Sequence, residues 1–175
     1  MAVLRKSISA PRPAREYGPE SAASDARKIA QQNLLKLVPL DVFGLAAVLG
    51  LNLVTYPMEE ATSGFLQNRD GRWDVGVNSL HHVNRQRFTV AHELGHFMLH
   101  RDHGSFMDGL LFRKSQVNPQ EREANLFASL LLMPEVEFRL AVANYDISEV
   151  AKTFAVSQQA VQFRIENLGQ SAVRG

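Results

Sequence analysis

Apolar residues recur at three- and four-residue steps from Ser24 onward, a spacing typical of one face of an α-helix. The pattern continues to Val38, and Pro39 should end the helix there. Asp41 can cap a second, short helix that runs to Leu49. The first fifty residues are therefore expected to contain two helices separated by a proline-containing turn.

Three short segments have the composition and alternation of β-strands. They are Leu51–Tyr56, Gly64–Asn68 and Trp73–Asn78. The pair Asp70–Gly71 between the second and third segments is a hairpin turn signal, because glycine readily supplies the positive φ of a tight turn. We therefore expect a small antiparallel sheet of about three strands.

The second half of the chain is expected to be helical. A long helix should span residues 84–102, and a further helix should begin at Pro119 and end before Pro134. Asn118 would cap this helix, with Glu121 folding back in a capping-box arrangement. Three more helices fit Glu135–Asn144, Ser148–Phe154 and Ser157–Leu168. Helices around a small sheet indicate the α+β fold class.

Composition and spacing divide the chain into three parts. Residues 1–22 contain three prolines and no periodicity, so we expect a flexible N-terminal tail. Residues 23–145 should form one α+β domain, with residues 146–175 as a C-terminal helical segment packed on it. That segment has helix-turn-helix spacing, with its turn at Ala155–Ser157 and Val161 packed beneath.

The composition excludes several kinds of chemistry. The 175 residues include no cysteine, so disulfides, thiolate metal sites and a cysteine nucleophile are ruled out. A metal would have to be held by histidine, carboxylate or neutral oxygen. The net charge of +1 provides no global attraction to nucleic acid or membranes. The sequence shows no apolar run near the roughly 20 residues of a membrane span and no secretory signal, so we expect a cytoplasmic protein.

The strongest chemical signal is the run His92-Glu93-Leu94-Gly95-His96 inside the long predicted helix. His92 and His96 should lie one turn apart on the same face, where both can reach one ion. Glu93 lies about 100° round the helix, beside that face, where it can accept a proton from water. This is the H-E-x-x-H motif of zinc hydrolases, although a histidine-bearing surface helix is the alternative. Gly95 costs about 1 kcal/mol in mid-helix, which suggests close approach by a neighbouring backbone.

A zinc site of this kind needs a third protein ligand. The candidates are His100, His103, Asp108, Glu121, Glu123 and Glu135. We favour Glu123, because the apolar positions of its helix indicate an inward face and a buried carboxylate needs a partner. His100 lies about two turns from His92, too far to share an ion with both histidines but near enough to line the pocket edge.

Two segments together resemble the ImmA/IrrE-type metallopeptidases. The first is Arg85–His96, followed by Leu99–His100, and the second is Glu121–Ala128, followed by Leu131–Pro134. The two motifs occur in the order and spacing of that family. The resemblance covers about residues 25–169.

The resemblance implies a zincin-like minimal metallopeptidase of the gluzincin kind. In such a site His92, His96 and Glu123 would bind zinc and Glu93 would be the general base. Phe127 stands four residues after Glu123, where thermolysin-like enzymes have an acid. The group that orients a ligand histidine is therefore not identified by the sequence.

The resemblance also implies a function. We expect a zinc-dependent endopeptidase that cleaves a helix-turn-helix (Xre-type) repressor encoded nearby and so derepresses phage, mobile-element or stress-response genes. Manganese or iron would accept the same ligands as zinc. The candidates for contacts with the substrate or the transition state are His100, His103 and Tyr145. An extended substrate could pair with an exposed edge strand, either Gly64–Asn68 or Trp73–Asn78.

The alternative is a DNA-binding regulator or toxin–antitoxin component that acts through residues 146–175. This segment contains three basic and three acidic residues. Phosphate binding favours a basic face, so direct DNA binding is the weaker hypothesis. A catalytically idle binding partner is disfavoured as well, because the base and a full set of ligands are present.

Overall fold

A computed structural model describes residues 17–101, 106–108 and 118–171 of the chain. Within these ranges the protein forms seven α-helices and four β-strands. In chain order they are α1 (Pro19–Gln32), α2 (Val42–Val48), β1 (Asn52–Tyr56), β2 (Gly64–Arg69), β3 (Arg72–Asn78), α3 (Val83–His100), β4 (Phe106–Asp108), α4 (Pro119–Leu132), α5 (Glu135–Asn144), α6 (Ile147–Phe154) and α7 (Gln158–Ser171).

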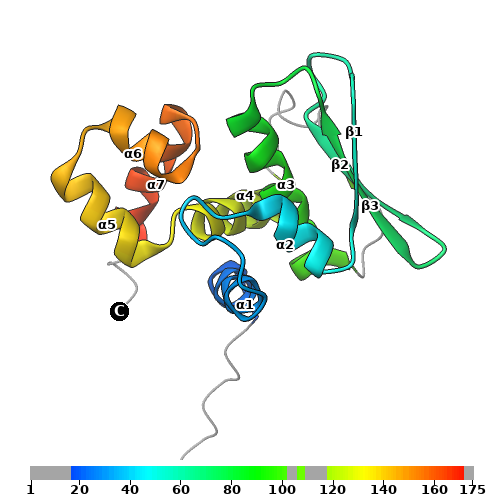
Figure 1. Ribbon diagram of the computed structural model, residues 1–175, viewed down its shortest axis with the longest axis horizontal. Coiled ribbons are helices and arrows are strands. Elements are labelled where there is room, and N and C mark those ends of the chain that lie inside the picture. Colours follow the sequence, from blue (N-terminus) through cyan, green and yellow to red (C-terminus); the bar gives the residue numbers. More distant parts are fainter. Residues whose placement is uncertain (1–16, 102–105, 109–117, 172–175) are drawn as a thin grey trace, which may run out of the picture.

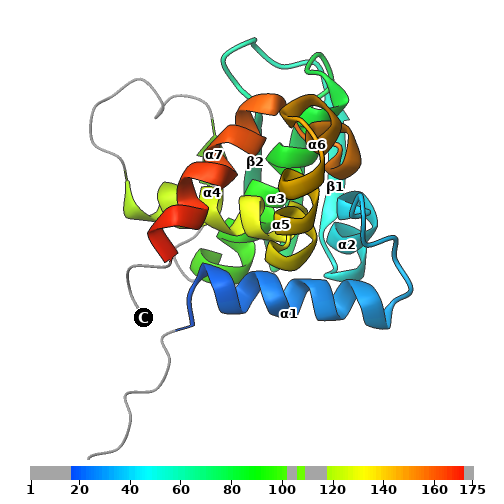
Figure 2. The same cartoon turned by 90° about the vertical axis from the view of Figure 1, so that its left-hand side faces the viewer.

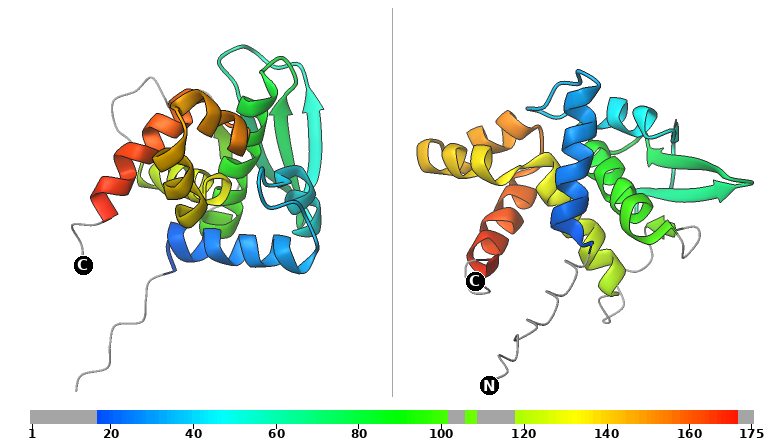
Figure 3. Two further views of the ribbon diagram at one scale, coloured as in Figure 1. Left: turned by 60° about the vertical axis from the view of Figure 1, so that its left-hand side comes forward. Right: turned by 90° about the horizontal axis from the view of Figure 1, so that it is seen from below.

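Helices α3 and α4 occupy the middle of the molecule (Figure 1). The sheet lies on one side of them, against α3, and α5, α6 and α7 gather on the other side. Helix α1 packs across α4 and α3 and runs along the base of the molecule (Figures 2 and 3). The α+β fold class is therefore confirmed, and α3 is the element that joins the sheet to the helical half.

The sheet has the strand order β1-β3-β2-β4 and is mixed. Strands β2 and β3 form the expected antiparallel hairpin, whose turn residues Asp70 and Gly71 have φ of 53° and 86°. Strand β1 pairs with β3 in parallel, and β4 pairs antiparallel with Gly64–Leu66 of β2. Two details differ from the expected antiparallel three-stranded sheet. The β1–β3 pairing is parallel instead of antiparallel, and β4 adds a fourth strand.

This strand order limits where an extended peptide could pair. Strand β3, which includes Trp73–Asn78, lies between β1 and β2 and has no open edge. Its selection as an edge strand was therefore wrong. The Gly64–Asn68 segment lies between β3 and β4, and its first three residues are paired on both sides.

The first helix is displaced toward the N-terminus relative to the expectation. Helix α1 begins at Pro19, inside the region expected to be a tail, because proline's fixed φ and missing N–H suit the first helical position. It ends at Gln32 instead of Val38, since Leu34 adopts a left-handed φ of 57°. The expected cap of α2 is confirmed, as Asp41 accepts a hydrogen bond from the Gly44 amide at 2.9 Å.

The C-terminal helices are attached to the centre of the molecule by polar contacts. The Asn84 side chain donates to the Val156 carbonyl at 3.1 Å, and Arg87 donates to the Ala155 carbonyl at 3.0 Å. Buried Arg164 donates to the Met133 carbonyl at 3.2 Å. The turn between α6 and α7 is thus held by the first turns of α3. None of the described helices has the length and apolar character needed to cross a bilayer.

Helices α3 and α4 approach closely at a glycine. A Cβ atom on Gly95 would lie 3.0 Å from the Cα atom and 3.1 Å from the carbonyl oxygen of Ala124. Both contacts are with backbone, which cannot move aside without shifting α4. The expected close backbone approach at Gly95 is confirmed, and it sets the distance between the two central helices.

We predict that enlarging residue 95 destabilises the protein. Gly95→Val should lower the free energy of unfolding by about 2 kcal/mol, because it overpacks the α3–α4 contact. Gly95→Ala should cost less, since alanine also regains about 1 kcal/mol of helix propensity. Urea unfolding measures both, with Ala143→Val at an exposed position of α5 as the control for β-branching. Equal effects of Gly95→Val and the control would contradict the close approach.

Candidate metal centre

Helix α3 carries the two motif histidines on one buried face. His92 and His96 are 2% and 1% exposed, and their Nε2 atoms lie 3.0 Å apart. The four-residue spacing places the rings one turn apart, as expected from the sequence. Two imidazole nitrogens at this distance point at a common position between the rings.

Glu121 of α4 completes the group. Its Oε2 atom lies 3.2 Å from Nε2 of His92, and its Oε1 atom lies 3.1 Å from Nε2 of His96. One ligand atom from each of these three residues lies within 4.8 Å of the others. Neighbouring ligands of a tetrahedral zinc ion, with bonds of about 2.0–2.1 Å, are roughly 3.3 Å apart. The donor set and its spacing therefore suit a divalent metal ion.

The expectation for Glu123 is corrected by this geometry. Its side chain is 50% exposed and its Oε2 atom lies 2.7 Å from Nε2 of His100, away from the two motif histidines. Glu121 does not fold back to cap the helix either. Asn118 alone supplies the cap, by accepting a hydrogen bond from the Gln120 amide at 3.0 Å. The carboxylate of Glu121 is thus directed toward α3.

The reason is the angular position of each glutamate on α4. At 100° per residue, Glu121 lies near the centre of the arc formed by the buried side chains of this helix, whereas Glu123 lies roughly 130° away. The buried residues that define the arc are Ala124, Phe127, Ala128, Ser129, Leu131 and Leu132. A helical projection of the sequence could have identified Glu121. The inward-face argument was sound, but it was applied to the wrong glutamate.

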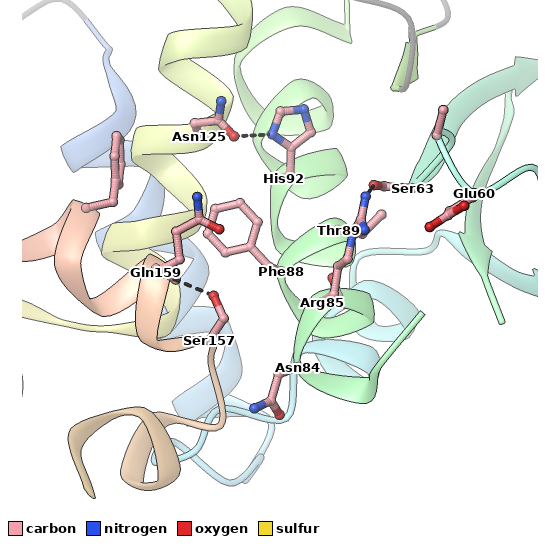
Figure 4. A pocket seen from close by; sticks show the side chains of 13 residues that line it. Glu60, Ser63, Asn84, Arg85, Phe88, Thr89, His92, Asn125, Ser157 and Gln159 are labelled. Atoms are coloured by element: carbon pink, nitrogen blue, oxygen red, sulfur yellow. Dashed lines mark hydrogen bonds between the residues drawn. The ribbon is translucent and has the colours of Figure 1, made fainter. Parts of the chain in front are cut away.

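Asn125 is the orienting group that the sequence left unassigned. It follows Glu121 by one helical turn, and its Oδ1 atom lies 2.9 Å from Nδ1 of His92 (Figure 4). An amide oxygen only accepts hydrogen bonds, so Nδ1 of His92 donates. Its Nε2 atom then presents a lone pair toward His96 and Glu121. The same face of α4 thus supplies a carboxylate to the centre and an amide behind it.

A second chain of hydrogen bonds lies behind His96. Nδ1 of His96 is 3.2 Å from Nδ1 of His100, whose Nε2 atom contacts Glu123 at 2.7 Å. The carboxylate accepts from Nε2 of His100, so with one proton on this ring its Nδ1 atom accepts from His96. This pattern leaves a lone pair on Nε2 of His96 as well. His100 is therefore placed behind the centre, and not among its three ligand atoms.

The electrostatics of the centre favour metal-binding protonation states. Burial lowers the pKa of His96, and although Glu121 opposes this effect, His92 and His100 reinforce it. Burial alone would raise the pKa of Glu121, but the imidazole groups of His92 and His96 beside its carboxylate outweigh this effect and hold that pKa far below its ordinary range. At neutral pH the centre combines a neutral imidazole with a carboxylate, the forms that bind metals.

The remaining candidate residues have different positions. Glu93 is fully buried on α3, directly after His92, and does not belong to the ligand group. Tyr145 is 60% exposed at the end of α5 and is not among the residues that line the centre or its cleft. His103 lies outside the described residues.

A cleft of about 910 Å³ opens beside the centre (Figure 4). One face of α3 forms its floor, from Asn84 and Arg85 through Phe88 and Thr89 to His92. The β1–β2 connection forms one side and the start of α7 the other. This volume falls within the roughly 300–1,000 Å³ typical of ligand sites. The cleft therefore adjoins the centre at His92 and is large enough to hold part of a polypeptide.

Comparisons with known proteins show a related sequence and a similar fold. Over 117 residues the chain is 25% identical to Metallopeptidase ImmA of Bacillus subtilis (strain 168). This aligned segment covers 64% of this chain and 68% of that protein. A solved structure of a Mycobacterium tuberculosis transcriptional regulator has a similar fold, with a TM-score of 0.55 and 18% identity. That match covers 80% of this chain but only 44% of the regulator.

The decisive comparison is with a protein family. Residues 46–166 match the sequence model of the M78 peptidases, described as the IrrE N-terminal-like domain. The match contains α3, α4 and every residue of the candidate centre, and it confirms the resemblance seen in the sequence motifs. Because it spans more than half of the chain, the protein belongs to the M78 family of metallopeptidases with an IrrE N-terminal-like domain.

Proposed function

We propose that this protein is a zinc-dependent endopeptidase whose metal is held by His92, His96 and Glu121. The observation that carries the proposal is the convergence of two Nε2 atoms and one carboxylate within 3.2 Å, beside an open cleft. Zinc is favoured because its tetrahedral site accepts two imidazoles and a carboxylate and leaves one position open. The Lewis acidity of a bound zinc ion would polarise a peptide carbonyl and acidify a water molecule.

In this proposal Glu93 is the general base. It would accept a proton from the attacking water and return it to the nitrogen of the leaving amine. Its place directly after His92 puts it on the helix that carries both histidine ligands. Complete burial limits competition from bulk water for its carboxylate. Asn125 and the His100–Glu123 pair would keep the ligand rings in their orientation and tautomer.

We further propose that the substrate is a helix-turn-helix repressor, cleaved in the cytoplasm to derepress neighbouring genes. The resemblance to the ImmA/IrrE-type enzymes supports this substrate, as does a cleft large enough for a polypeptide segment. Direct DNA binding receives less support. Among the basic residues of the C-terminal segment, Arg164 is buried against Met133, and Lys152 pairs with Glu149 at 2.6 Å.

The two glutamates of α4 provide a matched test of the metal ligands. Glu121→Gln should weaken zinc binding at least 100-fold, because it removes a charged ligand. Glu123→Gln, the same change two residues away, should retain one zinc per chain, because its amide oxygen can still accept from His100. Glu123→Ala should weaken zinc binding about 10- to 100-fold, as expected when an orienting partner is lost.

Competition with a chromophoric chelator measures these affinities, and elemental analysis gives the zinc content. Loss of zinc in Glu123→Gln with retention in Glu121→Gln would reverse the assignment. Less than one zinc per chain in the wild-type protein would overturn the metal centre itself.

Replacement of the proposed base should separate catalysis from metal binding. Glu93→Gln keeps the size of the side chain, so zinc affinity should stay within a few-fold of the wild-type value. Cleavage should fall about 10²- to 10⁴-fold, the usual contribution of a general base. The assay incubates zinc-loaded protein with the repressor encoded beside it and identifies fragments by mass spectrometry.

Glu137→Gln, an exposed position on α5, is the control and should cleave at the wild-type rate. Undiminished cleavage by zinc-loaded Glu93→Gln would exclude Glu93 as the base. An intact repressor after incubation with zinc-loaded wild-type protein would exclude that repressor as the substrate.

A further inference from the structure

The helix-turn-helix-like segment faces the cleft beside the metal centre. Four of its residues line that cleft together with His92, and we call them the C-terminal wall: Ser157, Gln159, Ala160 and Phe163. Phe163 follows Ala160 by three positions and Gln159 by four, so these side chains adjoin on one face at the start of α7. Figure 4 shows Ser157 and Gln159 across the cleft from α3. Residues near the C-terminus thus contribute to a site whose ligands lie on α3 and α4.

The cleft contains an apolar section next to the centre. Phe88 precedes His92 by one helical turn, about 6 Å along α3. Phe163 on the opposite wall is 39% exposed although it is a large aromatic residue, and Ala160 beside it is half-buried. An exposed aromatic ring in a cleft offers apolar area that a bound side chain can cover. This section suits a bulky aliphatic or aromatic side chain.

Polar groups with little charge surround the apolar section. Gln159 carries an amide group that can bond to peptide N–H and C=O groups, whereas the Asn84 amide and the Thr89 hydroxyl donate to the Val156 and Arg85 carbonyls and offer their oxygens as acceptors. Two charged residues also line the cleft, Glu60 and Arg85, and Arg85 is engaged with the Ser63 hydroxyl at 3.0 Å. One acid and one base give no net preference for a charged ligand. The lining therefore fits a segment of polypeptide in extended form better than a nucleic acid.

The C-terminal wall is fixed to the helix that carries the histidines. Asn84 and Arg87 of α3 hold the carbonyls of Val156 and Ala155, the residues just before the wall. On the other side of α7, Arg164 holds the Met133 carbonyl at the end of α4. The wall is thus anchored to both metal-centre helices. Such anchoring keeps its distance from His92 constant, as a specificity pocket requires.

We propose that the C-terminal wall selects the substrate, by binding a bulky apolar side chain close to the scissile bond against Phe88 and Phe163. This inference rests on the proposed peptidase function, because the occupant of the cleft is the polypeptide that the centre would cleave. It assigns to the helix-turn-helix-like segment a protein-recognition role inside the enzyme. The residues of this segment that line the cleft lie at the start of its second helix.

The test uses the zinc-loaded, full-length protein and tripeptide hydroxamates, in which the hydroxamate binds the metal. Leucine is placed in turn at each of the three positions, and triglycine hydroxamate is the reference. At one position leucine should raise the affinity of the wild-type protein at least tenfold, the value expected for burying one aliphatic side chain. Phe163→Ala should reduce this gain several-fold. Ala160→Trp, which fills the section, should abolish it.

The control is Gln162→Ala, on an exposed position of the same helix that does not line the cleft, and it should preserve the full gain. Zinc content and thermal unfolding are measured on every variant, so that changes in the wall are separated from loss of metal or fold. Equal binding of the leucine and glycine hydroxamates by zinc-loaded wild-type protein would overturn the apolar site while leaving the peptidase proposal intact.

A leucine gain that survives both Phe163→Ala and Ala160→Trp would overturn the role of the C-terminal wall. A wild-type protein without stoichiometric zinc would instead overturn the proposed function, and this inference with it. A gain that depends on Phe163 and Ala160, but not on Gln162, supports the proposal.

Discussion

The candidate centre depends on the close packing of α3 against α4. Two histidines come from one helix and the carboxylate from the other, so the distance between the helix axes decides whether the three groups can meet. Gly95 allows the backbone of Ala124 to approach to a distance that any side chain would oppose. Because Gly95 adjoins His96 and Ala124 lies three residues after Glu121, this contact controls the distance at which the ligand atoms face one another. The motif glycine is therefore part of the site, although it carries no functional group.

The packing of α3 against α4 buries polar side chains, and their hydrogen bonds offset the free-energy cost of removing them from water. His92, His96 and His100 are all nearly inaccessible to solvent, a position that is costly for unpaired polar atoms. Asn125 and Glu123 act as acceptors at the outer ends of the two networks, and each fixes the tautomer of the ring that it faces. As a result, both Nε2 atoms direct lone pairs to the same point. Binding of a cation there would relieve their repulsion and stabilise the native state by linkage.

Features of the site that lie within one helix could be predicted from the sequence. The third ligand residue, which lies on another helix, was identified only from the way α4 packs against α3. The motif histidines, the Asn118 cap and the role of Gly95 follow from spacing within one helix. The third ligand depends on which face of α4 meets α3, and one misassigned capping role was enough to exchange Glu121 for Glu123. Asn125 escaped notice for the same reason, because its position is meaningful only relative to Glu121. The parallel pairing of β1 with β3 joins residues more than twenty positions apart, and no local pattern reports such pairing.

The C-terminal segment illustrates how a packing pattern differs from a function. The helix-turn-helix spacing predicts two short helices that meet at a tight turn, and α6 and α7 do so around Ala155, whose φ is 51°. That spacing describes how the two helices bury Val150, Phe154 and Val161. It does not specify what the exposed face of the second helix contacts. Here Asn84 and Arg87 determine which surface α7 faces, because they hold the α6–α7 turn against α3. The start of α7 is thereby directed to the cleft. The same local motif thus serves a different surface because of two hydrogen bonds from another part of the chain.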